Sequence, residues 1–160
     1  MKTEVRAPFS LRWFCVQWLY AAAVVHSPIG VVLAWVPTWL LSELYHQPID
    51  LAFWQTTAPS AARAQQLWWI SLFGVTVQSL GLWMWALVYL GQRHRSRFAW
   101  GALIVGIVIW APQDIFISLQ ADAWLHVWVD LIAVVSLLPP LLWLYWYDGR
   151  QTSSAPERSS

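Results

Sequence analysis

Four ionisable side chains fall inside long apolar stretches of this sequence: His26, Asp114, His126 and Asp130. An Asp near the middle of a membrane helix costs roughly 2.5–3.5 kcal/mol on insertion scales, so such residues usually face a bundle interior or a cavity. His126 and Asp130 are spaced i, i+4 and therefore share one face of a helix. These residue types could bind a small molecule, handle a proton or hold a metal ion.

The two carboxylates are predicted to lie at nearly the same depth. At about 1.5 Å per helical residue, Asp114 lies roughly 7–8 Å before the end of its apolar stretch and Asp130 roughly 9 Å after the start of the next. His26 and Gln78 fall somewhat deeper, and Gln113 adds a neutral polar group. The candidate polar pocket therefore consists of Asp114, His126, Asp130, His26, Gln78 and Gln113.

Three interpretations of these residues remain open. The side chains could pair with one another and hold helices together in lipid. They could line a pocket that binds a lipid or small molecule, or that handles a proton. They could also hold a divalent metal through Asp114, His126 and Asp130 with Glu43 or His46, or a haem through His26 and His126. The spacing alone assigns no cofactor and no metal ligand.

The elements that carry these residues are four predicted membrane-spanning helices. The chain is 59% hydrophobic and 11% charged, whereas soluble domains carry about 25% charged residues. A span needs about 20 apolar residues, which is met by residues 11–35, 67–90, 98–119 and 124–147. We predict an all-α transmembrane four-helix bundle, with residues 1–148 as one domain and residues 149–160 as a disordered cytoplasmic tail.

The basic residues predict the orientation. Of the nine Lys and Arg residues, only Arg63 falls in the first loop. The others lie in the N-terminal segment up to Arg12, between the second and third spans, or after the fourth. Cytoplasmic loops carry the excess of Lys and Arg, so both termini are predicted to be cytoplasmic. The single cysteine, Cys15, excludes an internal disulfide.

The outer loop, residues 37–66, carries its own helical pattern. Trp39, Leu40, Leu41, Leu44 and Tyr45 fall on one face, Glu43 and His46 on the other, and Pro48 ends the pattern. This predicts an interfacial amphipathic helix that acts as a lid, with Glu43 and His46 above the bundle.

Fifteen tryptophans are many for a chain of this length. Most fall where aromatic belts lie, including Trp100 at the inner interface. Four deeper ones either pack against helices or line a pocket: Trp83, Trp85, Trp110 and Trp128.

Two resemblances follow from these residues. The run WAPQDIFISLQ at 110–120, followed by LHVWVD at 125–130, resembles a group of small, Trp-rich, four-helix bacterial inner-membrane proteins, some labelled cell division proteins. The resemblance extends to about Tyr147, implies a bacterial inner membrane and brings no catalytic residues.

The architecture is also similar to the sterol-isomerase and sigma-2-receptor superfamily, whose acid, histidine and aromatics surround an amine or carbocation. His126 and Asp130 fit that pattern, but in the last span rather than an early one.

We therefore expect an accessory or lipid- or small-molecule-binding membrane protein rather than an enzyme, with its pocket in the outer half of the bilayer. The alternatives are a membrane enzyme with an Asp/His acid–base pair and a metal- or haem-binding membrane subunit. Expected partners are membrane lipids and another membrane protein or a second copy. The charge pattern does not point to nucleic acid.

Overall fold

The computed structural model describes residues 10–35 and 46–153, which form five helices and no strand. Four are long and apolar enough to cross a membrane: α1 (Leu11–Trp35), α4 (Ser60–His94), α5 (Arg97–Gln120) and α6 (Trp124–Ser153). The fifth, α3 (Gln47–Trp54), is short. The predicted all-α transmembrane four-helix bundle is confirmed, and the chain is a multi-pass membrane protein.

The helices are longer than the predicted spans. α4 begins at Ser60, directly after Pro59 at its N-cap, rather than at residue 67. α6 runs to Ser153 and so includes part of the predicted tail. Asp148 and Gly149 are buried against other helices. Hydropathy identifies only the part of a helix that faces lipid. Contacts with other parts of the chain extend α4 and α6 beyond that part.

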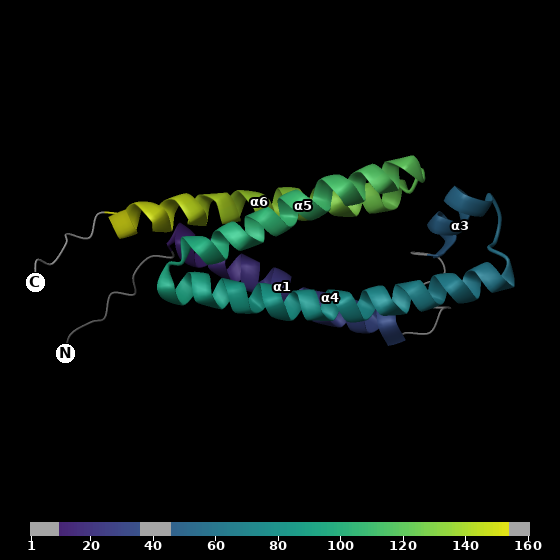
Figure 1. The fold of residues 1–160 in the computed structure, drawn as a ribbon, viewed down its shortest axis with the longest axis horizontal. Helices are drawn as coiled ribbons and strands as arrows, with labels where there is room; N and C mark the ends of the chain where they lie inside the picture. Colours follow the sequence, from purple (N-terminus) through teal and green to yellow (C-terminus); the bar gives the residue numbers. More distant parts are fainter. Residues whose placement is uncertain (1–9, 36–45, 154–160) are drawn as a thin grey trace, which may run out of the picture.

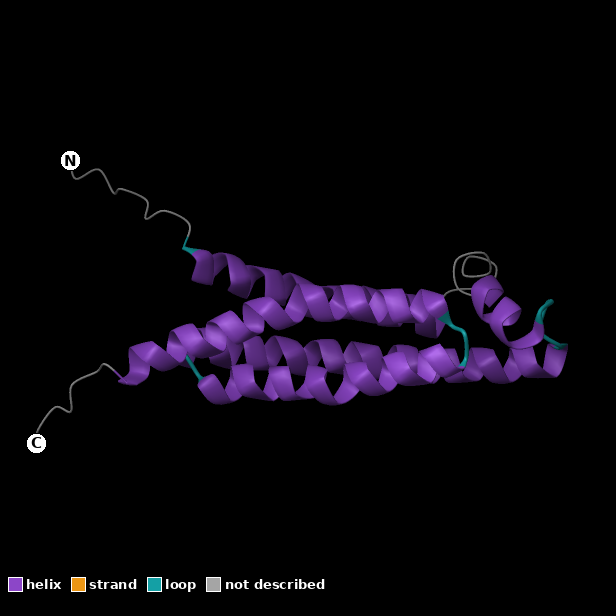
Figure 2. Ribbon diagram, turned by 90° about the horizontal axis from the view of Figure 1, so that it is seen from above, coloured by secondary structure: helices purple, strands orange, loops and turns teal. Residues whose placement is uncertain are grey.

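The long helices are arranged as two pairs. α1 packs mainly against α4, and α5 mainly against α6. At one end α1 begins, α4 turns into α5 and α6 ends; the α5–α6 turn and α3 lie at the other (Figures 1 and 2). We call the first the basic end, because its described residues include Arg12, Arg93, Arg95, Arg97 and Arg150. We call the second the far end. Figure 1 shows the two pairs diverging from the basic end.

Glycines allow α1 and α4 to approach closely. A Cβ atom added to Gly74 would lie 2.7 Å from the Ala34 nitrogen, and one added to Gly81 would lie 2.9 Å from the Ala23 oxygen. Small residues at such positions let helix backbones meet in a membrane. The α1–α4 pair is therefore held by backbone contact.

The buried core lies towards the basic end, where all four long helices contribute to it. Its members are Cys15, Val16, Leu19, Ala23, Met84, Val88, Trp100, Leu141 and Leu144. Most other large apolar side chains are exposed on the surface of the bundle. Lipid is as apolar as they are, so this exposure is expected.

The short helix α3 lies beside the start of α4 at the far end (Figure 1). Pro48 lies in its first turn, where a missing N–H breaks no helical hydrogen bond. Pro48 therefore lies at the beginning of a helix, and the predicted helical pattern that precedes it falls almost wholly outside the described residues. Residues 37–45 of the predicted lid, including Glu43, lie outside the described residues.

Candidate functional site

The carboxylate of Asp130 is buried in the α5–α6 pair. The residue is 3% exposed. Its Oδ2 atom accepts no hydrogen bond within the described part of the chain. Burying a charged oxygen without a donor is costly, and in a spanning helix water does not readily supply one. Asp50 Oδ1 also lacks a partner among residues 10–35 and 46–153, but it lies outside the spans.

Asp114 and His126 complete a small polar group around Asp130. The charges of both residues act on Asp130. The Asp114 carboxylate accepts a 2.9 Å hydrogen bond from Trp110 Nε1, one turn earlier on α5, and His126 lies one turn before Asp130 on α6. Asp114 on α5 and His126 and Asp130 on α6 thus lie near enough for their charges to interact, and we call these three residues the α5–α6 acid group.

Three other predicted pocket residues lie elsewhere. His26 Nδ1 donates to the Ala22 carbonyl at 2.7 Å, and Gln78 Nε2 donates to the Gly74 carbonyl at 3.4 Å. Both side chains lie against glycines in the α1–α4 contact. Gln113 is exposed and donates to the Ile109 carbonyl. Within the described residues, none of the three forms a hydrogen bond or ion pair with the α5–α6 acid group.

A second buried polar group fastens α3 to the start of α4. His46 is 2% exposed and Asp50 is 4% exposed. Asp50 forms an ion pair with Arg63, and Arg63 Nη1 donates to Gln66 Oε1 at 2.7 Å. Burial lowers the pKa of His46 below its usual value, the charge of Arg63 lowers it further, and that of Asp50 acts in the opposite direction.

The described residues contain no cluster suited to a metal ion. Among them, no group of three or more His, Cys, Asp or Glu side chains is arranged to hold one. The possible haem ligands His26 and His126 lie on different helix pairs. Glu43 lies outside the described residues, so a ligand set that includes it stays a hypothesis from the sequence alone.

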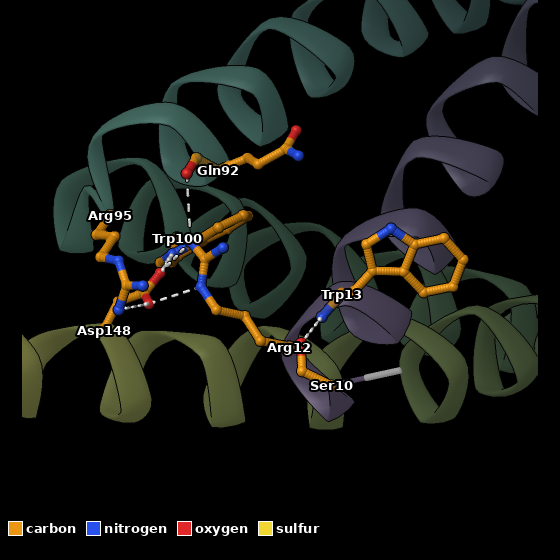
Figure 3. Close-up of polar contacts among 7 residues, drawn as sticks. All are labelled: Ser10, Arg12, Trp13, Gln92, Arg95, Trp100 and Asp148. Carbon is orange, nitrogen blue, oxygen red and sulfur yellow. Dashed lines mark hydrogen bonds and ion pairs between the residues drawn. The ribbon is translucent and has the colours of Figure 1, made fainter. Parts of the chain in front are cut away.

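Asp148, which the sequence interpretation passed over, is the most densely bonded acid among the described residues (Figure 3). It is 0% exposed. Arg12 donates from Nε to Oδ1 at 2.9 Å and from Nη2 to Oδ2 at 3.0 Å. Trp100 Nε1 donates to Oδ2 at 3.0 Å, and Arg95 Nη1 lies 3.9 Å from Oδ1. Arg12 also donates to the Gln92 carbonyl.

This Asp148 cluster links all four long helices, because its members come from α1, the end of α4, α5 and α6. Both oxygens of Asp148 are satisfied, so the cluster holds the bundle together. A sequence signal existed: Arg12 and Asp148 lie at the predicted cytoplasmic ends of the first and last spans. Trp100, expected in the aromatic belt, is instead fully buried because its indole donates to Asp148.

The four deep tryptophans are all exposed on the bundle surface. Trp110 donates a hydrogen bond to Asp114 of the α5–α6 acid group, whereas Trp85 stacks on Tyr89. Comparison with protein families, with curated proteins and with solved structures finds no match to this chain.

Proposed function

We propose that this membrane protein binds the ammonium group of a lipid or membrane-soluble small molecule at the α5–α6 acid group. The observation that carries the proposal is the buried Asp130 Oδ2 atom, which no described donor satisfies. A protonated amine supplies up to three N–H donors. Its positive charge would also offset the repulsion between Asp114 and Asp130.

Other features support a binding site over a purely structural one. Where the chain needs an acid for packing, at Asp148, it supplies donors to both oxygens. Asp130 lacks that arrangement although it is almost as deeply buried. A buried intramembrane acid with an oxygen that lacks a donor is by default a candidate for function.

The distribution of arginines supports an orientation. In the described part of the chain, Arg63 alone lies towards the far end, and the other arginines gather at the basic end. Under the positive-inside rule the basic end faces the cytoplasm, which puts the α5–α6 acid group in the outer half of the bilayer. With the resemblance to Trp-rich inner-membrane proteins, this favours a bacterial inner membrane.

The test is lipid retention measured by native mass spectrometry in mild detergent. Phosphatidylethanolamine carries N–H donors, whereas the quaternary amine of phosphatidylcholine carries none. A charge-assisted hydrogen bond contributes about 1.5–3 kcal/mol, so the wild type should prefer phosphatidylethanolamine by about 10-fold or more.

Asp130→Asn should abolish this preference, because the amide removes the charge while keeping the shape. Asp122→Asn is the matched control: Asp122 is exposed in the α5–α6 turn, and its backbone conformation, with φ 52°, suits Asn. The proposal is wrong if the wild type retains both lipids equally or if Asp130→Asn keeps the preference.

A further inference from the structure

Among the described residues of the basic end, five arginines face a single carboxylate. Asp148 is the only carboxylate there among the described residues, and it is engaged by Arg12, Arg95 and Trp100. Arg97 is exposed, and no carboxylate lies within ion-pair distance of it in the described part of the chain. Its guanidinium donors are therefore available to a ligand.

Arg97 is nevertheless held in one place. Its Cζ atom lies 4.5 Å from the centroid of the Tyr145 ring, a cation–π contact. The guanidinium also lies across Gly149, where an added Cβ atom would be 2.7 Å from Nε and 3.0 Å from Cζ. Any residue larger than glycine at position 149 would displace the Arg97 side chain. We call Arg97, Tyr145 and Gly149 the Arg97 seat.

An open hollow lies on the adjoining surface of α6. Its volume is about 610 Å³, and it is lined by Trp143, Trp146, Tyr147, Arg150 and Gln151. Trp146 lines the hollow and packs edge-on against Tyr145, with ring centroids 5.8 Å apart, so Trp146 is shared between the hollow and the Arg97 seat. Two tryptophans, a tyrosine and an arginine are the residue types that meet lipid headgroups at a membrane surface.

We propose that the Arg97 seat and this hollow bind the phosphodiester of an anionic phospholipid. Arg97 would donate to the phosphate, and its planar guanidinium suits a bidentate contact. The α6 aromatics would lie beside the glycerol and the upper acyl chains. A lipid is the occupant because the site lies where the apolar spans end, at headgroup level.

The experiment compares retention of phosphatidylglycerol and phosphatidylcholine by the full chain in native mass spectrometry. Arg97→Gln should lower phosphatidylglycerol retention about 10-fold, as expected for the loss of one charge-assisted bidentate contact. Arg93→Gln is the matched control, because Arg93 is also an exposed arginine of the basic end but donates to Tyr89. It should lower retention less than about 2-fold, by loss of diffuse attraction alone.

Gly149→Ala tests the seat without changing any charge. The added methyl group displaces the Arg97 guanidinium and should lower phosphatidylglycerol retention at least about 3-fold, through loss of the preorganised contact. Circular dichroism and thermal unfolding report whether the Gly149→Ala variant still folds. If it does not fold, Tyr145→Leu tests the Arg97 seat instead, because it removes the ring under Arg97.

Equal losses in Arg97→Gln and Arg93→Gln would mean diffuse charge attraction and would overturn the proposal. Displacement of the bound lipid by millimolar glycerol phosphate as readily as by phosphatidylglycerol would indicate a soluble phosphate ligand and would also overturn it. The site is separate from Asp130, so neither result bears on the amine site.

Discussion

Asp130 and Asp148 are buried carboxylates of the same helix in opposite surroundings. Asp148 accepts hydrogen bonds on both oxygens from Arg12 and Trp100. Asp130 has one oxygen with no donor among the described residues. Removing one partner of a buried ion pair is strongly destabilising, whereas an acid kept for a ligand contributes little to folding. Substitution at the two positions should therefore affect different properties.

Asp148→Asn should lower the free energy of unfolding by about 3 kcal/mol, because it leaves the partly buried guanidinium of Arg12 without its counter-charge. Thermal unfolding in detergent, followed by circular dichroism, measures the change. Asp122→Asn, at an exposed turn, should stay within about 0.5 kcal/mol of the wild type. Equal melting of the Asp148→Asn variant and the wild type would show that the cluster does not stabilise the bundle.

The spacing of residues predicted part of the candidate site and not the rest. Asp114, His126 and Asp130 lie near enough for their charges to interact, because depth and i, i+4 spacing are good guides to position in an antiparallel helix pair joined by a short turn. Helix rotation and the choice of neighbouring helix are set by packing, so Gln113 faces outwards and Gln78 faces α1. Asp148 was missed because it lies just past the predicted span, where hydropathy no longer marks the helix.

At the scale of elements, apolar composition predicts the ends of a helix only where lipid surrounds that helix. The start of α1 and its end at Trp35 coincide with the predicted span of 11–35. α4 and α6 extend further, because Pro59 begins one and the Asp148 cluster holds the last turns of the other. The pairing of α1 with α4 depends on glycine contacts that hydropathy does not report.

The two glycines Gly74 and Gly106 should respond to alanine in opposite ways. A Cβ atom at Gly74 meets the α1 backbone, whereas one at Gly106 meets nothing within 4 Å. Gly74→Ala should destabilise the fold by about 1–3 kcal/mol through overpacking. Gly106→Ala should be neutral or stabilise it by up to about 1 kcal/mol, because alanine favours helix. Thermal unfolding of both variants tests this, and a Gly74→Ala variant as stable as Gly106→Ala would exclude the close α1–α4 contact.

Docking of α3 on α4 should weaken in acid. The pKa of His46 is lowered from 6.5 by burial and by Arg63 on α4, with Asp50 on α3 acting in the opposite direction. Free α3 therefore binds a proton more readily than docked α3, so docking is strongest above about pH 6.5 and weakens as the pH falls below that value.

Hydrogen–deuterium exchange of α3 amides at pH 7.5 and 5.5, corrected for intrinsic rates, measures this loss. Exchange should be faster at pH 5.5 in the wild type, and the difference should shrink in His46→Gln, which cannot titrate. Equal protection of α3 at both pH values in the wild type would contradict the account.

At the scale of the whole molecule, the two ends of the bundle differ in construction. The buried core and the Asp148 cluster hold the helix pairs together at the basic end. At the far end the pairs diverge (Figure 1), and the α5–α6 acid group belongs to one pair only. The proposed amine site therefore lies towards the end where the two helix pairs diverge.

The proposed orientation predicts which positions a reagent can reach from outside the cell. In a Cys15→Ala background, Asp122→Cys should react with a membrane-impermeant maleimide in intact cells. Gln151→Cys at the basic end should react only after permeabilisation, because the proposed orientation, based on the side that carries eight of the nine basic residues, puts that end in the cytoplasm. Labelling of Gln151→Cys in intact cells would reverse the orientation.

The most direct measurement of the amine site is a solid-state NMR distance between the carboxyl carbons of ¹³C-labelled aspartate and the nitrogen of ¹⁵N-labelled phosphatidylethanolamine. An ammonium bonded to a carboxylate oxygen brings these atoms within about 4 Å. We predict a dipolar coupling of that size in the wild type, lost in Asp130→Asn and kept in Asp122→Asn. The absence of this coupling, or its survival in Asp130→Asn, would contradict the proposal that Asp130 binds an amine.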